Sequence, residues 1–351
     1  MKVAMIGYAQ CGRSTLYRAA AGGSVKGDFT AVPVPDERFD TIVQQVQPKK
    51  QTPATLILHD DLDSVATGGK AFSQKLIDQA KKADLLLHVV RAFENPISPY
   101  HAEVDPQRDC SNLEVEIVLS DLQIIENRLE RLQKSTTVKT PGSTDYLDKV
   151  SLEKFKAALE EGRPIRSLDL TEDDQNTIKS YQFLSAKPMV VCFNVNESDA
   201  GSPTEAVKKA MAGLAEIGTE SFVACATIEE EIAQLDPADQ GEFLASLGLT
   251  VPASHLIVRA VYDALGLITF FTAGENDTRA WPLRRGSSAL KAAATIHNDI
   301  AKGFIRAEIV HYADYVAAGS LDAAYSAGKM SLEGKEYVIQ DGDLLHIRNK
   351  S

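Results

Sequence analysis

Residues 7–14 read Gly7-Tyr8-Ala9-Gln10-Cys11-Gly12-Arg13-Ser14 and follow the short apolar run Lys2-Val3-Ala4-Met5-Ile6. The apolar run predicts a buried strand, and residues 14–19 predict the start of a helix. A glycine-rich loop between a strand and a helix is the setting in which backbone N–H groups and the helix N-terminus bind phosphate. The segment therefore predicts a P-loop with an α/β domain around it.

The loop departs from the P-loop pattern at Arg13, where a lysine is expected. A guanidinium is longer, planar and forked, whereas the lysine ammonium is a compact charge. Two interpretations stay open: a weakened phosphate contact, or a surface arginine in a vestigial loop. Ser14 is also a candidate Mg²⁺ ligand. The nucleotide-binding residues expected in this segment are Gly7, Gln10, Cys11, Gly12, Arg13, Ser14 and Thr15.

Composition limits the class of protein. The 351 residues are long enough for two or three domains, and the net charge of −12 argues against broad nucleic-acid binding. No apolar run approaches the roughly 18 residues of a membrane span. The four cysteines show no metal-ligand spacing, although Cys11 at a helix N-terminus predicts a favoured thiolate. We expect a cytoplasmic protein with no membrane and no sequence-specific DNA among its partners.

The apolar pattern changes along the chain. Runs at 55–59, 84–90, 188–193 and 221–225 predict buried strands of an α/β domain. Between them the spacing alternates between 3 and 4 residues, as expected of a helix with one apolar seam, at Val115, Val118, Leu122, Ile125, Leu129 and Leu132. A second apolar face, at Leu152, Phe155 and Leu159, predicts the returning helix of a hairpin. Residues 337–347 predict two strands around an Asp-Gly turn.

These patterns predict an α/β fold with three parts. We expect a P-loop GTPase-like domain with a mainly parallel sheet over 1–111 and 165–265. An antiparallel helical hairpin over 112–164 is inserted into it, and residues 266–351 form a smaller C-terminal domain.

Two further motifs come in the order of a GTPase-like domain. Asp60 follows the strand at 55–59, where a carboxylate holds Mg²⁺ through water. Asn194 and Glu197 follow the strand at 188–193, where a loop reads the purine base. Alternatives stay open here too. Asp60 as a solvated loop carboxylate is the favoured interpretation, whereas for Asn194 and Glu197 base contact is favoured over helix capping.

With these motifs in place, the chain resembles the YchF/Obg-like ATPase family over nearly its full length. The similarity rests on residues 32–40, His88-Val89-Val90-Arg91-Ala92-Phe93-Glu94, Asn194-Val195-Asn196-Glu197, and residues 267–274, 279–281, 296–299 and 303–308. The resemblance implies a C-terminal TGS domain of β-grasp fold, ATP accepted over GTP through the NxxE motif, Mg²⁺ with ATP as cofactor, and ribosome association. It also adds Ala226 to the expected nucleotide-binding residues.

The departures from the family pattern lie on the γ-phosphate side. They are Arg13, a shortened segment before Val32, and Asp63 in place of the glycine of switch II; Gly68-Gly69 nearby predict a mobile loop. We expect a YchF-like protein that binds ATP or GTP, with weak ATPase or GTPase activity at best. The alternative is a non-enzymatic adaptor that docks on the ribosome or a protein partner through the hairpin and the TGS domain.

Overall fold

The computed structural model describes residues 1–22, 27–66, 72–135 and 137–350, so part of the shortened segment before Val32, and Gly68-Gly69, lie outside the described residues. Its contacts divide the chain into two compact units. The first comprises Met1–Thr30 and Ile57–Ala260, and the second comprises Ala31–Leu56 and Val261–Ser351. Residues 31–56, which the sequence-based boundaries place in the first domain, thus group with the C-terminal residues.

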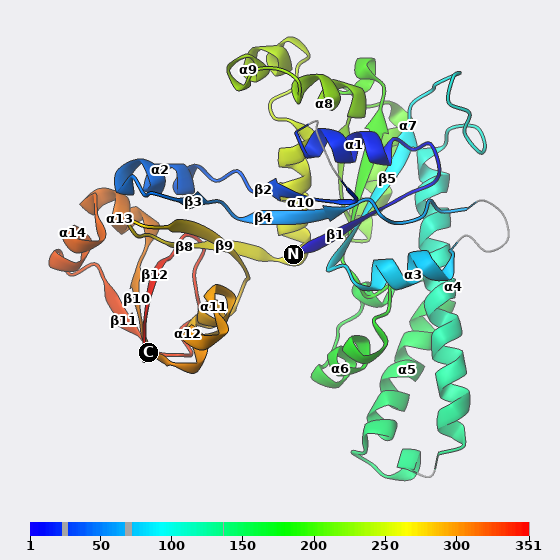
Figure 1. The fold of residues 1–351 in the computed structure, drawn as a ribbon. Coiled ribbons are helices and arrows are strands. Elements are labelled where there is room, and N and C mark those ends of the chain that lie inside the picture. Colours follow the sequence, from blue (N-terminus) through cyan, green and yellow to red (C-terminus); the bar gives the residue numbers. More distant parts are fainter. Residues whose placement is uncertain (23–26, 67–71, 136, 351) are drawn as a thin grey trace. The chain divides into compact units, whose positions relative to one another are not determined.

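The first sheet has the strand order β2-β4-β1-β5-β6-β7. Its strands are β1 (Lys2–Ile6), β2 (Phe29–Pro33), β4 (Thr55–His59), β5 (Leu85–Ala92), β6 (Met189–Val195) and β7 (Glu220–Ala224). The helices up to the second unit are α1 (Arg13–Ala20), α3 (Gln74–Lys81), α4 (Pro106–Gln133), α5 (Thr144–Glu160), α6 (Glu172–Tyr181), α7 (Glu205–Glu216), α8 (Ala226–Ile232), α9 (Pro237–Ser246) and α10 (Ala253–Leu265), with short 3₁₀ turns η1 (Thr137–Lys139), η2 (Ile165–Ser167) and η3 (Glu197–Asp199) (Figure 1).

The centre of this sheet explains why its strands read as continuous apolar runs. β5 and β6 are buried along their whole length, as expected of parallel strands covered on both faces. β1, β5 and β6 run parallel, so their carboxyl ends meet at one edge. Ligands of open α/β sheets bind outside such an edge, and the P-loop begins there. Among the described residues, none of the helices combines the length and apolar character needed to cross a bilayer.

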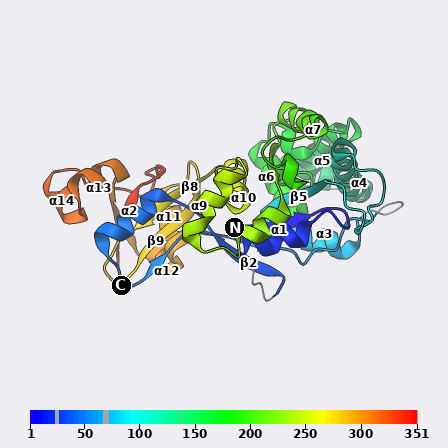
Figure 2. The same cartoon turned by 90° about the horizontal axis from the view of Figure 1, so that it is seen from above.

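α4 and α5 form the antiparallel hairpin that the heptad spacing predicts, and α6 packs beside it in both views (Figures 1 and 2). Val118, Ile125 and Leu132 are buried in one cluster with the returning face of α5. Val115, expected as the first seam position, is instead 53% exposed. The packed seam therefore begins at Val118, because α4 starts against the sheet and only later faces α5.

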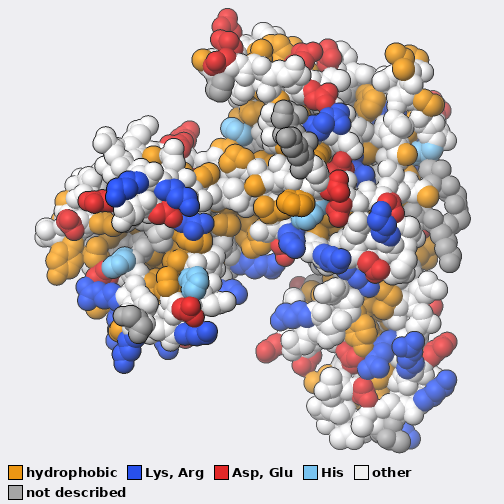
Figure 3. All heavy atoms as spheres, viewed as in Figure 1, with side chains coloured by type: hydrophobic (Ala, Val, Ile, Leu, Met, Phe, Trp, Pro, Cys, Tyr) orange, Lys and Arg blue, Asp and Glu red, His pale blue; other side chains and the backbone are white. Residues whose placement is uncertain are grey.

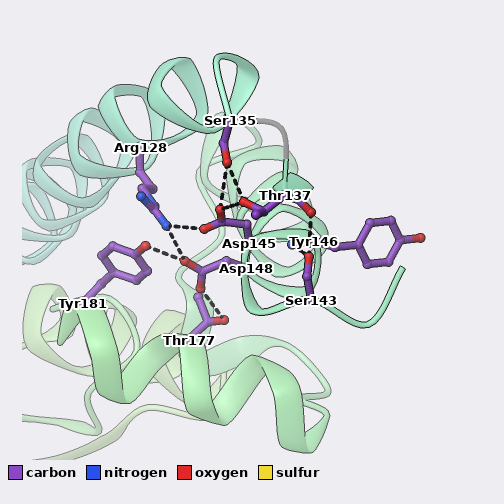
Figure 4. A network of polar contacts seen from close by, with 9 residues as sticks. All are labelled: Arg128, Ser135, Thr137, Ser143, Asp145, Tyr146, Asp148, Thr177 and Tyr181. Atoms are coloured by element: carbon purple, nitrogen blue, oxygen red, sulfur yellow. Dashed lines mark hydrogen bonds and ion pairs between the residues drawn. The ribbon is translucent and has the colours of Figure 1, made fainter. Parts of the chain in front are cut away.

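A polar network connects the two hairpin helices, α4 and α5, with the neighbouring α6 (Figure 4). Arg128 of α4 donates to Asp145 and Asp148 of α5 at 3.1 and 3.4 Å. Asp148 also accepts from Thr177 at 3.1 Å and from the Tyr181 hydroxyl at 2.6 Å, both on α6. Asp148 is buried, so its partners supply the hydrogen bonds that water no longer can. The hairpin is thus held by specific contacts as well as by its apolar seam.

The second unit is built on a sheet of order β11-β10-β12-β8-β9-β3. Its elements are α2 (Glu37–Val46), β3 (Gln51–Thr52), β8 (Leu267–Thr272), β9 (Thr278–Arg284), α11 (Ala289–Ile296), α12 (Asn298–Lys302), β10 (Phe304–Val310), α13 (Tyr312–Ala318), α14 (Leu321–Ser326), β11 (Ser331–Glu333) and β12 (Leu344–Asn349). β3 pairs in parallel with β9, which explains why residues 31–56 belong to this unit. Trp281 stacks on Phe270 and donates to Thr272 at 3.0 Å, so it is a packed residue of the sheet.

The sequence predicts two strands joined by the turn at Asp341-Gly342, and only the second of them forms. β12 forms, but it pairs with β10 and β8, and Val338 makes only an isolated bridge to Ser288. Asp341 accepts from the Thr269 N–H at 2.9 Å, and Asp343 accepts from the Gln340 N–H at 2.9 Å. Asp341 thus holds the turn against β8, while Asp343 binds the backbone within the turn, and the residues before the turn do not pair with β12.

Candidate functional site

The P-loop has the backbone shape that phosphate binding needs. Gln10 and Gly12 have φ of 65° and 85°, a left-handed conformation that turns successive N–H groups inward. A Cβ at Gly12 would lie 2.1 Å from the Asn194 amide nitrogen, so this position excludes a side chain. No side chain of the described residues caps α1 at Gly12. The backbone N–H groups at the start of α1 therefore point into the loop, where an anion such as a phosphate group can bind them.

Arg13 is not the surface arginine that one of the two interpretations expects. Its Nε donates to Asp60 Oδ1 at 2.6 Å, and its Nη2 and Nη1 donate to the carbonyls of Leu62 and Asp63 at 2.7 and 3.4 Å. Both charged side chains are only 11% exposed. The arginine is thus an internal cation that neutralises the carboxylate following β4 and binds the segment after it.

This ion pair also bears on Mg²⁺, which the sequence places at Ser14 and Asp60. Asp60 Oδ1 already has the Arg13 guanidinium at hydrogen-bond distance, and Ser14 lies exposed. Among the described residues, no group of three or more His, Cys, Asp or Glu side chains has a metal-binding arrangement. A Mg²⁺ ion at Ser14 and Asp60 would therefore have to compete with Arg13 for the Asp60 carboxylate.

Asp63 has a partner that the sequence did not reveal. Lys75 donates to its carboxylate at 2.9 Å and Ser73 at 3.2 Å. The hydrogen bond from Lys75 lowers the pKa of the Asp63 carboxyl below its usual value. Because the charge is shared with Lys75, repulsion of a bound phosphate is weaker than Asp63 alone would predict.

A pocket of about 540 Å³ lies beside the P-loop, at the carboxyl ends of β5 and β6. From the expected residues it brings together Gln10, Gly12, Thr15, Asn194, Glu197 and Ala226. Gly7, Cys11, Arg13 and Ser14 are not among the described residues that line it. The pocket thus joins part of the P-loop to the loop after β6, where the sequence predicts contact with the base.

Asn194 connects the P-loop with the start of α8. Its amide nitrogen donates to the Cys11 carbonyl at 3.0 Å, and its oxygen accepts from the Ala226 N–H at 3.0 Å. The side chain is buried, so these two bonds hold the P-loop against the start of α8. Glu197, in contrast, is exposed at the start of η3 and presents its carboxylate on the pocket wall.

Sequence reasoning assigned no role to Arg91, which shapes the opposite wall. The residue is 1% exposed and donates to the carbonyls of Gln10 and Phe93, each at 3.0 Å. Its guanidinium lies 4.3 Å from the Phe93 ring centroid. Ser98 adds a 2.7 Å bond to the Gln10 side chain. One signal was available, because Arg91 is the only Arg or Lys in a fully buried strand whose other residues, apart from His88, are apolar.

The expectation of a favoured Cys11 thiolate is wrong. Burial raises the pKa of the Cys11 thiol to about 11, against the smaller opposing effect of the neighbouring Arg13. Desolvation of a fully buried thiol outweighs the helix N-terminus. Cys11 is therefore a packed thiol beneath the loop.

The fold and the site together define a class: a P-loop protein with a G-domain-like parallel sheet, a helical hairpin between β5 and β6, and a TGS-like C-terminal domain. Residues 267–350 match the family model YchF-GTPase_C, described as a protein of unknown function (DUF933). The chain is 36% identical over 359 residues to the Ribosome-binding ATPase YchF of Bacillus subtilis, covering 98% of each. It is 31% identical to Obg-like ATPase 1 of Oryza sativa subsp. japonica, covering 99% of this chain and 92% of that protein.

A solved structure gives the same result. The structure of the Schizosaccharomyces pombe YchF GTPase superposes with a TM-score of 0.89 at 29% identity, covering 99% of this chain and 97% of that one. The chain belongs to the YchF/Obg-like ATPase family.

Proposed function

We propose that this protein binds an adenine nucleotide beside the P-loop and hydrolyses it weakly or not at all. The observation that carries the proposal is that the pocket near Asn194 and Glu197 is open, whereas the charged residues at the P-loop are paired with each other. The base-side pocket is open and lined by Asn194 and Glu197, while Arg13 and Asp60 on the phosphate side neutralise each other at 2.6 Å. The Bacillus subtilis relative is named an ATPase, which supports the nucleotide class.

Recognition of the base is assigned to the residues on the pocket wall. The Glu197 carboxylate accepts from the exocyclic amino group of adenine, and Ala226 lines the pocket beside Asn194. Gln10, Gly12 and Thr15 line the same pocket, so the P-loop lies beside the bound base in this proposal. GTP is the second nucleotide to test, because a carboxylate also accepts from guanine.

Weak hydrolysis follows from the Arg13 contacts. Phosphoryl transfer depends on positioned cations that neutralise the charge developing on the phosphoryl oxygens. Here Arg13, the cation of the loop itself, donates to Asp60 and to two backbone carbonyls instead. Since Asp60 is paired with Arg13, we expect nucleotide binding to depend little on Mg²⁺.

A second candidate function is that of an adaptor on the ribosome or a ribosome-associated protein. The hairpin over 112–164 carries ion pairs such as Lys156–Glu126 and Lys149–Glu153, and both charge signs are mixed over the face shown in Figure 3. A mixed surface suits a protein partner better than the uniformly negative backbone of RNA. The Bacillus subtilis relative is named ribosome-binding.

The test is a calorimetric titration with ADP, ATP and a non-hydrolysable ATP analogue, with Mg²⁺ and with a chelator. We expect saturable binding below about 1 mM, changed less than about threefold by the chelator. Arg13→Lys should release Asp60 and strengthen Mg²⁺-dependent binding by about tenfold. Arg18→Lys on the same helix is the matched control, because its pair with Glu230 is exposed. Absence of binding at millimolar nucleotide would eliminate the first function and leave the adaptor.

A further inference from the structure

Arg91, near the carboxyl end of β5, is a buried cation without an acidic partner. Its side chain is 1% exposed, and it forms no ion pair with an Asp or Glu in the part of the chain that the structure describes. Asp109 lies nearby in α4 but is bound by Arg108 at 2.8 Å and by the Tyr100 hydroxyl at 2.7 Å. A buried charge is costly unless other groups compensate it, so the groups that Arg91 contacts indicate its role.

The guanidinium of Arg91 binds backbone carbonyls and aromatic rings. Besides the carbonyls of Gln10 and Phe93, the carbonyl of Asn95 accepts from Nη2 at 3.5 Å. The Phe93 and Tyr100 ring centroids lie 4.3 and 4.9 Å from the guanidinium carbon, close enough for cation–π contact. Phe93 and Asn95 are local partners, whereas Gln10 is 81 positions away and belongs to the P-loop.

Gln10 has a backbone conformation that glycine usually adopts. Its φ is 65°, and the Cys11 N–H donates to the Tyr8 carbonyl at 3.3 Å, so residues 8–11 form a turn whose third residue has a positive φ. Such turns favour glycine at that position, and a residue with a Cβ is strained there. The bond from Arg91 to the Gln10 carbonyl and the bond from Ser98 to its side chain both oppose the release of this strain.

Asn194 makes the corresponding contact from the neighbouring strand. Arg91 and Asn194 are paired in the parallel register of β5 and β6. Two successive P-loop carbonyls, those of Gln10 and Cys11, therefore accept from side chains at paired strand positions. The C=O and N–H of a planar trans peptide point in opposite directions, so the Gly12 N–H points away from Asn194. Arg91 fixes the peptide unit immediately before that one.

We propose that Arg91 is a positioning residue for nucleotide binding, which holds Gln10 in the left-handed conformation that the P-loop needs to receive phosphate. This role rests on the nucleotide binding proposed above. An arginine suits it because the planar guanidinium donates in several fixed directions, and so reaches the Gln10 and Phe93 carbonyls together. Phe93, Asn95 and Ser98 also line the pocket, so one side chain fixes both the loop and part of the pocket wall.

The test is a calorimetric titration of the full chain with ADP and with adenosine, which lacks the phosphates. Arg91→Met removes every donor and keeps an apolar side chain in the buried site. ADP binding should weaken by at least about tenfold, because the loop that receives the phosphates is no longer held. Adenosine binding should weaken by less than about threefold, since only the pocket wall is affected.

A second substitution separates positioning from general support of the fold. In the Gln10→Gly background the left-handed conformation carries no Cβ penalty, so Arg91 is no longer needed to maintain it. Adding Arg91→Met to Gln10→Gly should therefore weaken ADP binding by less than about threefold. A residue that only supports the fold would weaken ADP binding equally in both backgrounds.

Arg108→Met is the matched control. Arg108 is also a cation beside Tyr100 and Asp109, but it does not line the pocket and makes no contact with the P-loop among the described residues. Its substitution should change ADP affinity by less than about twofold. Far-UV circular dichroism of each variant shows whether the chain is folded.

Two results overturn the proposal while nucleotide binding stands: ADP affinity that Arg91→Met leaves unchanged, or equal losses in the two backgrounds. Absence of ADP binding to the wild-type chain instead overturns the proposed function, and the role of Arg91 with it. If Arg91→Met fails to fold, the guanidinium N–H signals of Arg91 in NMR spectra of the wild-type chain replace it. Signals that shift with ADP and not with adenosine support the proposal, and any other pattern refutes it.

Discussion

Breaking the Arg13–Asp60 ion pair should destabilise the first unit strongly, and in a way that shows the two residues act together. Arg13→Ala leaves a carboxylate that is 11% exposed without its cation, and it removes the donors to Leu62 and Asp63. Removing one partner of a buried pair costs about 3 to 5 kcal/mol. The slight exposure of this pair places the expected loss at the lower end, about 3 kcal/mol.

The double-mutant cycle separates the pair from its surroundings. Asp60→Ala should also lose about 3 kcal/mol, because a buried guanidinium is left with carbonyl partners only. The double variant should lose about 4 kcal/mol, giving a coupling free energy of about 2 kcal/mol. A 2.6 Å charge-assisted hydrogen bond between nearly buried groups accounts for that magnitude.

The assay is equilibrium urea unfolding followed by far-UV circular dichroism. Trp281 is the single tryptophan and lies in the second unit, so its fluorescence reports that unit separately in the same sample. Arg18 and Glu230 supply the control cycle, because Arg18 is also on α1 but the two side chains are 48% and 35% exposed. That pair should show less than about 1 kcal/mol of coupling.

The outcome that refutes the reasoning is a small coupling for the internal pair. A value below about 0.5 kcal/mol for Arg13 and Asp60, or one no larger than that of the exposed pair, is the range typical of surface ion pairs. Arg13 would then be a solvated side chain, and the argument for weak hydrolysis would lose its basis.

Three further predictions concern the same unit. Gly12→Ala should cost at least about 2 kcal/mol more than Gly22→Ala in denaturant midpoints, because both positions have positive φ but only Gly12 faces a clash with Asn194. Burial lowers the pKa of His88 to about 3, so on acidification the unfolded chain takes up a proton before the folded chain does. The free energy of unfolding is therefore highest at neutral pH and falls as the pH is lowered. Between about pH 6 and about pH 4.5 the wild-type chain should lose about 2 kcal/mol more than His88→Leu, and equal losses would contradict this. Burial raises the pKa of Glu229 to about 7, so ionisation destabilises the fold as pH rises from about 4.5 through about 7. Glu229→Gln should therefore gain about 2 kcal/mol on the wild-type chain between about pH 5 and about pH 8, measured by urea unfolding.

The predictable parts of this molecule are those with local causes. β4 is confirmed at residues 55–59, because alternating and continuous apolar runs define strands from neighbouring residues alone. The capping box at Thr171 and Asp174 also has a local cause, and both reciprocal bonds are present. The P-loop backbone follows the same logic, since its glycine permits the left-handed conformation that starts α1.

The candidate site was predictable only as a set of positions. Asp60 and Glu197 follow strands and Asn194 lies near the end of β6, and parallel strands bring their carboxyl ends to one edge. Their partners were not predictable. Asn194 reaches Cys11 across 183 positions of sequence, and Arg13 reaches Asp60 across 47. No local pattern encodes which of several polar groups at that edge will pair.

The sequence by itself determined the class of protein: a strand–loop–helix P-loop, a hairpin with a heptad seam, and a C-terminal domain of the family. Only the tertiary structure decided what Arg13 does, that Cys11 is a buried thiol, and that residues 31–56 belong with the second unit. The physical reason is the range of the interactions. Backbone propensity and apolar spacing act over a few residues, whereas burial and the pairing of charges depend on which distant segments the fold brings together.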